Sequence, residues 1–474
     1  MARYIVTVTP PTPNGDLHLG HLSGPFLAAD ICRRSLMAKG HDVIMVCYSD
    51  DYQSYLPRKA EALNRSAADY GALMRRAIVL SSELAGVEFD HFPPARDNPW
   101  FRDSVEHYLD CVAEDVSAQV VSVHRCPNCR KWGHEAWGRG GCNTCGTSSD
   151  ASQCEGCASK PIPALMTGMT CIACGTPMRM ETQTAQVWAL GRHFETVAAW
   201  HATRGMRDDL RDYLAANLAK TSDTWPITRP GDAGLPVARF GGDPVHTWFM
   251  GLSGYRAAVK EYLEDHPERG RFADWWSPQT NLVHFLGFDC SYSHAIAYAV
   301  QQVCDPSGPT IGRFVTNRFL MLDGDDFSTS RGNAVWIKDV TGLYPADAIR
   351  LFTALHAPET KAENFVMAEF KAWVQEVFRP LCAELTRAVE QGLPAQSGAR
   401  WTGTAAAIAC ADAARVDSFS MQTMARSVMR LLDEVRAAPA ADRPAGYRLV
   451  IDLIAPIMPT LSETLARTLT HEPA

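Results

Sequence analysis

Four Cys-x-x-Cys pairs within residues 126–174 constrain the fold of this chain more than any other feature of its sequence. Twelve, eight and thirteen residues separate successive pairs, and pairs of this kind are typical of tetrahedral zinc sites. The eight candidate ligands are Cys126, Cys129, Cys142, Cys145, Cys154, Cys157, Cys171 and Cys174. We therefore predict two structural zinc ions, since four-thiolate sites keep no open position for catalysis. The spacing leaves open whether sequential or interleaved pairs share a metal.

The bulk composition narrows the class of protein. A chain of 474 residues is too long for one ordinary core, so we expect roughly two to four domains. Its 46% hydrophobic and 21% charged residues are typical of a soluble globular protein, and no run approaches the ~20 apolar residues of a membrane span. The first eight residues alternate like a strand and lack the apolar core of a signal peptide, which predicts a cytoplasmic location. A net charge of −8 argues against broad, charge-driven binding of nucleic acid, although a local basic face is compatible with it.

The pattern of apolar residues predicts an α/β fold interrupted by the cysteine block. A strand at 3–9 is followed by a Pro/Asn/Gly loop and a helical stretch at 19–38. A second strand at 42–47 runs into acidic residues, and a third at 282–287 runs into Asp289. Because open α/β sheets bind ligands at the carboxyl ends of their strands, we expect the site there. The fold predicted is a Rossmann-type catalytic domain split by a zinc-binding insertion.

The last hundred residues are predicted to form an α-helical bundle. Apolar residues recur there at three-four spacing, from Phe370 to Leu381 and again from Met421 to Leu432. The Pro/Ala-rich stretch 437–446 is interpreted as a loop between helices. The domain boundaries predicted are 1–115 and 231–320 for the two halves of the catalytic domain, 116–230 for the insertion, 321–368 for a region that links this domain to the bundle, and 369–474 for the bundle.

Two histidines follow the first strand and its loop, in the run Asp16-Leu17-His18-Leu19-Gly20-His21. Imidazoles three positions apart at a helix start can donate hydrogen bonds to a phosphate, aided by the field of the helix N-terminus. Gly20 allows an adenine to lie against the backbone. Taken alone, the motif is equally compatible with two surface histidines.

These motifs resemble the class I aminoacyl-tRNA synthetases, and the methionyl branch in particular. Pro11-Thr12-Pro13-Asn14-Gly15 with His18-Leu19-Gly20-His21 is similar to the ATP-binding signature of that family. His284-Phe285-Leu286-Gly287-Phe288-Asp289 with His294, and Phe327-Ser328-Thr329-Ser330-Arg331-Gly332-Asn333, are similar to its ribose-binding segment and its second signature loop. The cysteine pairs are similar to its zinc insertion, so the resemblance spans most of residues 3–370. It implies that residues 321–368 form a signature-loop and stem-contact region.

The resemblance implies a role for each matching position, with ATP and Mg²⁺ as substrates. The catalytic set implied is His18, His21, Ser328, Ser330 and Arg331, and the ATP-binding set is Pro11, Asn14, Gly20, Gly287 and Asp289. The amino-acid-binding set implied is Pro10, Thr12, Asp50, Trp248, Tyr255 and His294, with Asp50 pairing the substrate ammonium. The chemistry needs no nucleophilic side chain, because the substrate carboxylate itself attacks the α-phosphorus.

The chain departs from the family pattern at positions that matter for this chemistry. Asp326 and Thr329 stand where the second signature loop carries lysines, and Phe288 stands at a third basic position. Loss of one such phosphate contact typically costs about 100-fold in rate. Arg318 and Lys338 are candidate replacements.

The amino-acid pocket and the tail also differ. Thr12 replaces an aromatic residue, Met250 an aspartate, and Tyr52-Gln53 a His-Gly pair. The tail lacks the Asn…Pro-Trp…Lys pattern with which methionyl enzymes read the anticodon, and residues 431–436 offer no base-stacking aromatic. The changes in the pocket argue against specificity for methionine. The changes in the tail argue against tRNA-Met as the acceptor.

The favoured hypothesis is a ligase that activates an amino acid and passes the acyl group to a small hydroxyl-bearing acceptor. The resemblance implies an N-hydroxylated amine of specialised metabolism as the acceptor. It also implies a partner enzyme in the same biosynthetic pathway. A genuine methionine-tRNA ligase, which would use tRNA, and a catalytically inactive synthetase-like binding protein are the alternatives; ATP affinity separates the inactive protein from the other two. A nucleotidyltransferase is disfavoured, because such folds carry neither the zinc insertion nor the helical tail.

Overall fold

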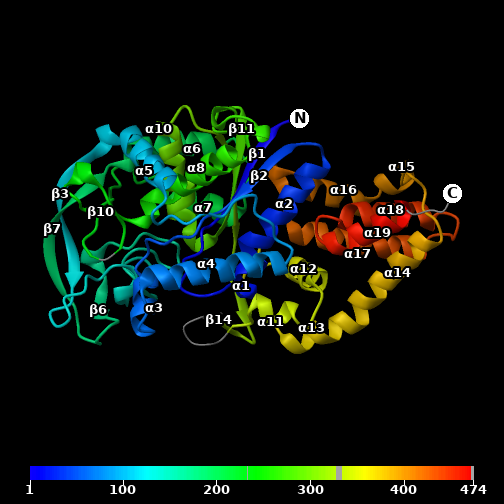
Figure 1. The fold of residues 1–474 in the computed structure, drawn as a ribbon, viewed down its shortest axis with the longest axis horizontal. Coiled ribbons are helices and arrows are strands. Elements are labelled where there is room, and N and C mark those ends of the chain that lie inside the picture. The colour runs from blue at the N-terminus through cyan, green and yellow to red at the C-terminus, as the bar shows by residue number, and fades with distance from the viewer. Residues whose placement is uncertain (232, 327–333, 471–474) are drawn as a thin grey trace.

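The computed structural model describes residues 1–231, 233–326 and 334–470. Figure 1 shows an elongated molecule with a parallel sheet near its centre, the long antiparallel strands β3 and β7 at one end, and the C-terminal helices at the other. Among the described residues, no helix is long and apolar enough to cross a membrane. The cytoplasmic location stays a prediction.

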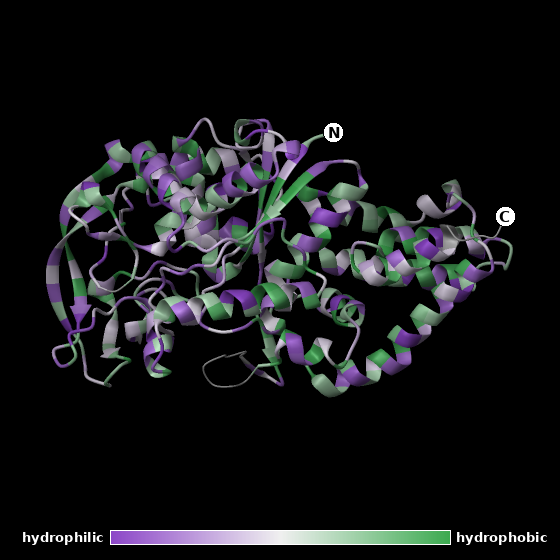
Figure 2. Cartoon of the chain, in the orientation of Figure 1, coloured by the Kyte–Doolittle hydropathy of each residue, from purple (hydrophilic) through white to green (hydrophobic). Residues whose placement is uncertain are grey.

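A four-stranded parallel sheet in the order β12-β11-β1-β2 forms the centre of the catalytic fold. Its strands and helices are β1 (Arg3–Val8), α1 (Leu19–His21), α2 (Leu27–Ala38), β2 (Asp42–Val46), α3 (Tyr55–Ala62), α4 (Ala67–Leu84), α5 (Pro99–Cys111), α8 (Thr247–Asp265), α9 (Phe272–Trp275), β11 (Thr280–Gly287), α10 (Ala299–Cys304) and β12 (Thr310–Asn317). Figure 2 shows hydrophobic residues, in green, along these central strands. The predicted α/β fold with a split catalytic domain is confirmed.

The two halves of this sheet are separated in sequence by an insertion of short strands and helices. Its elements are β3 (Val116–Arg125), β4 (Gly138–Gly141), β5 (Ser148–Ser149), β6 (Thr167–Cys171), β7 (Arg179–Trp188), α6 (Phe194–His201), α7 (Asp208–Leu218) and β8 (Trp225–Pro226), followed by β9 (Leu235–Pro236) and β10 (Pro244–Val245). β3 and β7 pair antiparallel over ten residues, and β4 pairs with both β5 and β6. The insertion thus forms sheets of its own and leaves the central sheet parallel.

Helices dominate the chain after β12. The elements are β13 (Leu320–Leu322), β14 (Asp325–Asp326), α11 (Ile337–Thr341), α12 (Ala346–Leu355), β15 (Glu363–Phe365), α13 (Met367–Trp373), α14 (Arg379–Glu390), α15 (Gly398–Thr402), α16 (Ala405–Ala413), α17 (Met421–Ala437), α18 (Arg443–Ile454) and α19 (Pro459–Thr470). The predicted apolar stripe of α17 is buried, which confirms the helical tail. The loop interpreted at 437–446 is too long, because Pro444 lies in the first turn of α18, where its missing N–H costs nothing. The five predicted domain boundaries stay predictions.

The helix predicted at 19–38 is interrupted shortly after it begins. α1 and α2 are separated by a π-helical turn, Leu22–Phe26, in which Gly24 leaves helical geometry and Pro25 lacks an N–H donor. A Cβ at Gly24 would lie 2.4 Å from the amide nitrogen of Asn317, so glycine lets this turn approach the end of β12. The kink therefore sets the histidine motif against the carboxyl edge of the sheet.

Arg350 joins the catalytic fold to the helical tail. Its fully buried guanidinium pairs with the equally buried Asp30 of α2, 2.6 Å away. It also donates to the carbonyls of Gly86 (2.8 Å), Pro456 (3.0 Å) and Ile457 (2.8 Å). Helix α12 thus fastens α2, the end of α4 and the α18–α19 turn to one another.

Alternate residues of β1 lie in two different hydrophobic cores, and one of these cores continues into the tail helices.

We predict that Arg350→Met destabilises the protein by about 3 kcal/mol, since it strands a buried carboxylate and several carbonyls. Arg34, which also bonds Asp30 at 2.8 Å, moderates the loss. The urea midpoint is the measurement. Arg430→Met removes an exposed arginine as the control and should change stability by less than about 0.5 kcal/mol. An Arg350 variant as stable as this control would contradict the prediction.

Candidate functional site

The carboxyl ends of four parallel strands bring the predicted site residues to one edge of the sheet. Residues 10–21 follow β1, Asp50 follows β2, Asp289 follows β11, and Arg318 follows β12. Parallel pairing fixes this convergence, because Val8 lies opposite Phe285 and Thr7 lies opposite Val46. Segments that are far apart in the sequence therefore meet here.

His18 and His21 form a close pair, with ring centroids 4.0 Å apart. Nδ1 of His18 accepts from the Gly20 N–H at 3.1 Å, and Nδ1 of His21 accepts from the His18 N–H at 3.3 Å. An imidazole that accepts at Nδ1 carries its proton on Nε2 when neutral. Burial lowers the pKa of His18 to about 2 and that of His21 to about 4, so both rings are neutral at physiological pH. The pair can donate hydrogen bonds to an anionic oxygen.

Asp50 is a buried carboxylate held by hydrogen bonds. The Thr247 hydroxyl donates to Oδ1, and the Gln53 amide donates to Oδ2 at 2.6 Å. Its backbone N–H donates to the Pro11 carbonyl at 3.0 Å, which ties it to the loop after β1. In the part of the chain that the structure describes, no basic side chain lies within ion-pair distance. Burial raises the pKa of Asp50 to about 7, and the nearby Glu135 and Asp51 add to the rise.

Aromatic side chains close the space beside Asp50. The Tyr255 hydroxyl donates to the Val8 carbonyl at 3.1 Å and lies 3.1 Å from Nε2 of His294. Trp248 follows Thr247 on α8, while Pro10, Thr12 and Asn14 are half-buried in the loop after β1. Two further tyrosines approach glycines of α8 closely, because a Cβ at Gly251 would meet the Tyr298 hydroxyl at 1.6 Å and one at Gly254 would meet the Tyr48 ring at 2.2 Å. Glycine at these two positions therefore lets both tyrosines pack directly against α8.

Asp289 lies two residues after the end of β11, and a side chain of the insertion donates a hydrogen bond to it. The Gln153 amide donates to its Oδ2 at 2.8 Å. A Cβ at Gly287 would lie 2.5 Å from Oδ1, so glycine leaves the room that this carboxylate occupies. Burial raises the pKa of Asp289 to about 6. The carboxylate is placed to accept hydroxyl hydrogen bonds.

Arg318 lies beside Phe288, where the family pattern has lost a basic residue, and Lys338 lies beside the loop before the histidine pair. The Arg318 guanidinium stacks 3.5 Å from the ring centroid of Phe288 and pairs with Asp209 at 2.7 Å. Lys338 Nζ lies 3.7 Å from Oδ2 of Asp16, in the loop that precedes the histidine pair. The predicted loop residues Ser328, Ser330 and Arg331 fall outside the described residues.

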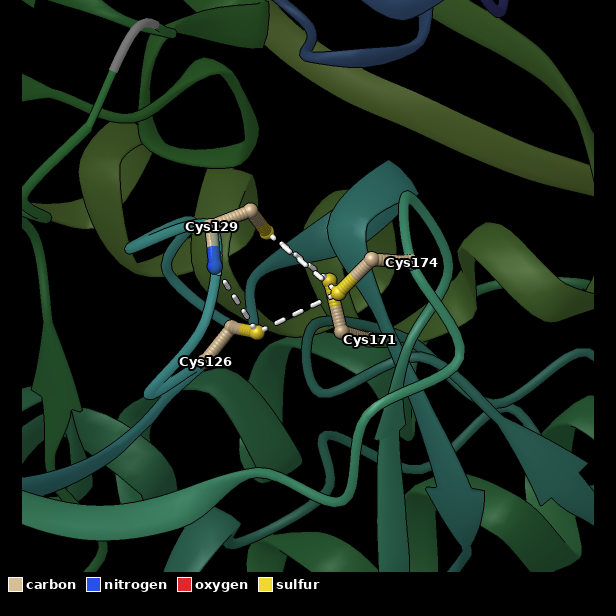
Figure 3. Close-up of side chains that lie close together, drawn as sticks. All are labelled: Cys126, Cys129, Cys171 and Cys174. Carbon is tan, nitrogen blue, oxygen red and sulfur yellow. Dashed lines mark hydrogen bonds between the residues drawn. The ribbon is translucent and has the colours of Figure 1, made fainter.

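The eight paired cysteines form two groups of four. The first and fourth pairs converge, as Figure 3 shows for Cys126, Cys129, Cys171 and Cys174, and the second and third pairs form the other group. Sulfur–sulfur distances of 3.4–3.7 Å in the first group and 3.6–3.9 Å in the second are close to the roughly 3.8 Å expected around a tetrahedral zinc with ~2.3 Å bonds. Each group could hold one metal ion. The pairs that share a site are thus nested, which is neither the sequential nor the interleaved sharing considered from the spacing.

Several contacting residues were not identified from the sequence. Gln153 and Thr247 carry no motif of their own, although each directly precedes a residue that was singled out. Tyr48 and Tyr298 contact glycines of helix α8. This contact depends on how the helix packs, and no sequence pattern predicts it. The one available signal was position, since Tyr48 lies two residues before Asp50.

The comparisons with known proteins agree with this geometry. Residues 4–389 match the family model described as tRNA synthetases class I (M), so the chain belongs to that family. Methionine–tRNA ligase of Pyrococcus furiosus is 26% identical over 394 residues, covering 79% of this chain and 54% of that protein, and the enzyme of Christiangramia forsetii is 28% identical over 398 residues, covering 78% and 55%. The chain spans about half the length of these relatives. The fold also matches Mycobacterium tuberculosis methionyl-tRNA synthetase bound by methionyl-adenylate, with a TM-score of 0.74, 15% identity and coverage of 99% and 95%.

We predict that Asp50→Asn stabilises the protein above pH 7, by about 2 kcal/mol. The folded carboxyl has a pKa of about 7 against an ordinary 3.8, so folding retains a proton between these values and wild-type stability falls as pH rises through that window. Urea unfolding of both proteins at pH 5 and pH 8 measures the difference, which should be larger at pH 8. The exposed Glu114→Gln is a charge-matched control. An equal difference at both pH values would refute this electrostatic account.

Proposed function

We propose that this chain is an ATP-dependent ligase that activates an amino acid as its adenylate and transfers the acyl group to a small hydroxyl acceptor, such as an N-hydroxylated amine. The observation that supports it most is the meeting of the neutral histidine pair, Asp50 and the half-buried Asp289 at one sheet edge, with no basic side chain within ion-pair distance of Asp50 among the described residues. These groups suit the phosphates, the ammonium and the ribose of an aminoacyl-adenylate. An inactive protein would have no use for a buried carboxylate that has hydrogen bonds but, among the described residues, no basic side chain within ion-pair distance.

The proposed roles follow the geometry. His18 and His21 donate to the phosphates of ATP, which enters with Mg²⁺, while Pro11, Asn14, Gly20 and Gly287 shape the adenosine site. Asp50 pairs with the substrate ammonium, and Pro10, Thr12, Trp248, Tyr255 and His294 surround its side chain. Arg318 and Lys338 supply positive charge that the signature loop lacks, alongside Ser328, Ser330 and Arg331. Asp289 accepts from the ribose hydroxyls.

The reaction proceeds in two displacements. A carboxylate oxygen of the amino acid attacks the α-phosphorus of ATP, and pyrophosphate leaves. The acceptor hydroxyl oxygen then attacks the carbonyl carbon of the adenylate, the bond from that carbon to the phosphate oxygen breaks, and AMP leaves with the electron pair and takes up the hydroxyl proton. The protein contributes positioning and charge stabilisation to both steps.

The helical tail favours a small acceptor over tRNA. Among its described residues, no aromatic side chain is exposed: Phe370, Phe378, Trp401 and Phe419 are buried, and Trp373 and Tyr447 are half-buried. The Tyr447 hydroxyl donates to Glu384, which also pairs with Arg436 at 2.6 Å. Reading single-stranded RNA normally uses exposed aromatic rings as stacking platforms. A genuine methionine-tRNA ligase is the second candidate, supported by what the relatives are named.

Amino-acid-dependent exchange of pyrophosphate into ATP tests the proposal. We expect exchange with one or a few amino acids, and no charging of total tRNA by the same protein. Exchange with methionine together with charging of tRNA-Met would establish the second candidate. No exchange and no binding at millimolar ATP would leave only an inactive protein. Arg318→Met should lower the exchange rate by about tenfold, whereas the exposed Lys361→Met should leave it unchanged.

We further propose that each cysteine group holds a structural zinc ion. The thiolates would bind the metals, which would fix the loops of the insertion. The second group contains Cys154, and the adjacent Gln153 holds Asp289. This metal would thereby set the position of the ribose carboxylate.

Metal content and ATP affinity together check this assignment. Cys142→Ser with Cys154→Ser should reduce zinc from two to one per chain and raise the KM for ATP by about tenfold. Cys126→Ser with Cys171→Ser is the matched control, and should also lose one zinc but leave the KM for ATP within about twofold. An equal change of KM in both double variants would show that the second metal has no special link to the nucleotide.

A further inference from the structure

Two further sets of side chains that could hold a metal lie outside the paired cysteines and outside the adenylation site. Each set contains one carboxylate, one imidazole and one thiol, whose ligand atoms lie within 4.8 Å of one another. The α5 triad consists of His107, Cys111 and Asp305, and the insertion triad consists of Asp115, His193 and Cys304. The triads adjoin, because Cys304 and Asp305 are consecutive residues. The same set of donors therefore occurs twice, side by side.

Three parts of the fold that are distant in sequence bring these side chains together. His107 and Cys111 are four residues apart on α5, so they share one face of that helix. Asp115 and His193 lie at the base of the paired strands β3 and β7, and α10 ends at Cys304. Helices α5 and α10 pack side by side (Figure 1). The triads therefore lie where the insertion meets both halves of the catalytic fold.

In both triads the carboxylate and the thiol approach the same imidazole nitrogen. Nε2 of His107 lies 3.0 Å from Oδ2 of Asp305 and 3.8 Å from Sγ of Cys111. The corresponding distances from Nε2 of the imidazole in the insertion triad are 2.6 Å and 3.7 Å. A nucleophilic Cys-His-Asp arrangement instead places the thiol at one ring nitrogen and the carboxylate at the other. Three donors around one point are the geometry of ligands that share an ion.

The distances leave room for a zinc ion after a small adjustment. The nitrogen–sulfur distances are close to the roughly 3.6 Å expected across a tetrahedral zinc with bonds of ~2.1 and ~2.3 Å. The nitrogen–oxygen distances are those of hydrogen bonds, so an entering ion would move each carboxylate away from the imidazole by roughly 0.4–0.8 Å. Ion pairs alone would use the imidazoles and the carboxylates, but would not explain why a thiol contacts each imidazole.

One oxygen of each carboxylate is held by a neighbour, and the other oxygen faces the imidazole. Oδ1 of Asp305 accepts from the Ser307 N–H at 3.1 Å and from the Ser307 hydroxyl at 2.6 Å. Oδ1 of Asp115 accepts from the Arg192 guanidinium at 3.0 Å. Outer hydrogen bonds of this kind orient the ligands of metal sites. Both Oδ2 atoms are therefore fixed in the position that a ligand needs.

We propose that each triad binds one zinc ion through its imidazole, thiolate and carboxylate, with the fourth position open to water. The two ions would tie the base of the insertion to α5 and α10. Helix α10 continues from the π-helical segment Tyr292–Tyr298, which carries His294 of the candidate site. The metals would therefore hold this helix at the end that lies about 15 Å from His294. The proposal does not depend on the adenylation reaction.

Equilibrium dialysis against micromolar zinc, followed by metal analysis, tests this assignment. We expect the wild type to bind two more zinc ions per chain than the double variant Cys111→Ser with Cys304→Ser. Each single variant should lose one ion, whereas Cys382→Ser, at a half-buried cysteine outside both triads, should lose none. Dialysis against citrate should empty these three-ligand sites, while the four-cysteine groups keep their two zinc ions per chain. Zinc added back should raise the melting temperature of the wild type but not of the double variant.

Equal zinc content in the wild type and the double cysteine variant would overturn the proposal and leave two ion pairs only. Metal held by the eight paired cysteines cancels in this comparison, because every variant keeps them. If the double variant misfolds, His107→Gln with His193→Gln replaces it, and the same loss of two ions is expected. Glutamine can still donate a hydrogen bond to each carboxylate but offers no imidazole to the metal, so this variant separates the metal from the ion pairs.

Discussion

The parallel pairing of β1 with both β2 and β11 is the constraint on which the rest of the structure depends. Parallel strands direct all their carboxyl ends to one edge, and polar segments that follow them must meet there. The histidine pair, Asp50 and Asp289 therefore lie at one edge of the sheet, although they belong to three separate segments of chain. The insertion is tolerated because it leaves and re-enters between strands and builds its own small sheets.

Local patterns were enough to predict the fold. The strands around Val6, Ile44 and Val283 are short apolar runs with clear breaks, and such runs are what a sheet covered on both faces requires. The stripe of α17 was equally clear, because residues at three-four spacing share one helix face. Boundaries were less accurate where proline acts in two ways: Pro25 interrupts a helix, whereas Pro444 begins one.

The site could be predicted only as far as its motifs reach. Single residues such as His18 and Asp289 stand in recognisable runs, and the structure places them together. Their partners come from elsewhere in the chain: Thr247 contacts Asp50 across 197 positions and Gln153 contacts Asp289 across 136. No periodicity encodes such contacts. The nested sharing of cysteine pairs was hidden for the same reason, since spacing along the chain does not determine which loops meet.

The central place of β1 also has a consequence for how the protein is made. Arg3 of β1 lies opposite Thr280 of β11, and the contact between Thr7 and His284 spans 277 positions. At about 5–20 residues per second, a ribosome needs on the order of tens of seconds to supply β11 after β1 has emerged. During that time β1 can pair only with β2, and the edge that later pairs with β11 leaves its backbone N–H and C=O groups without strand partners. Newly made chains therefore pass through an aggregation-prone stage, which makes production in cells sensitive to temperature and to the supply of chaperones.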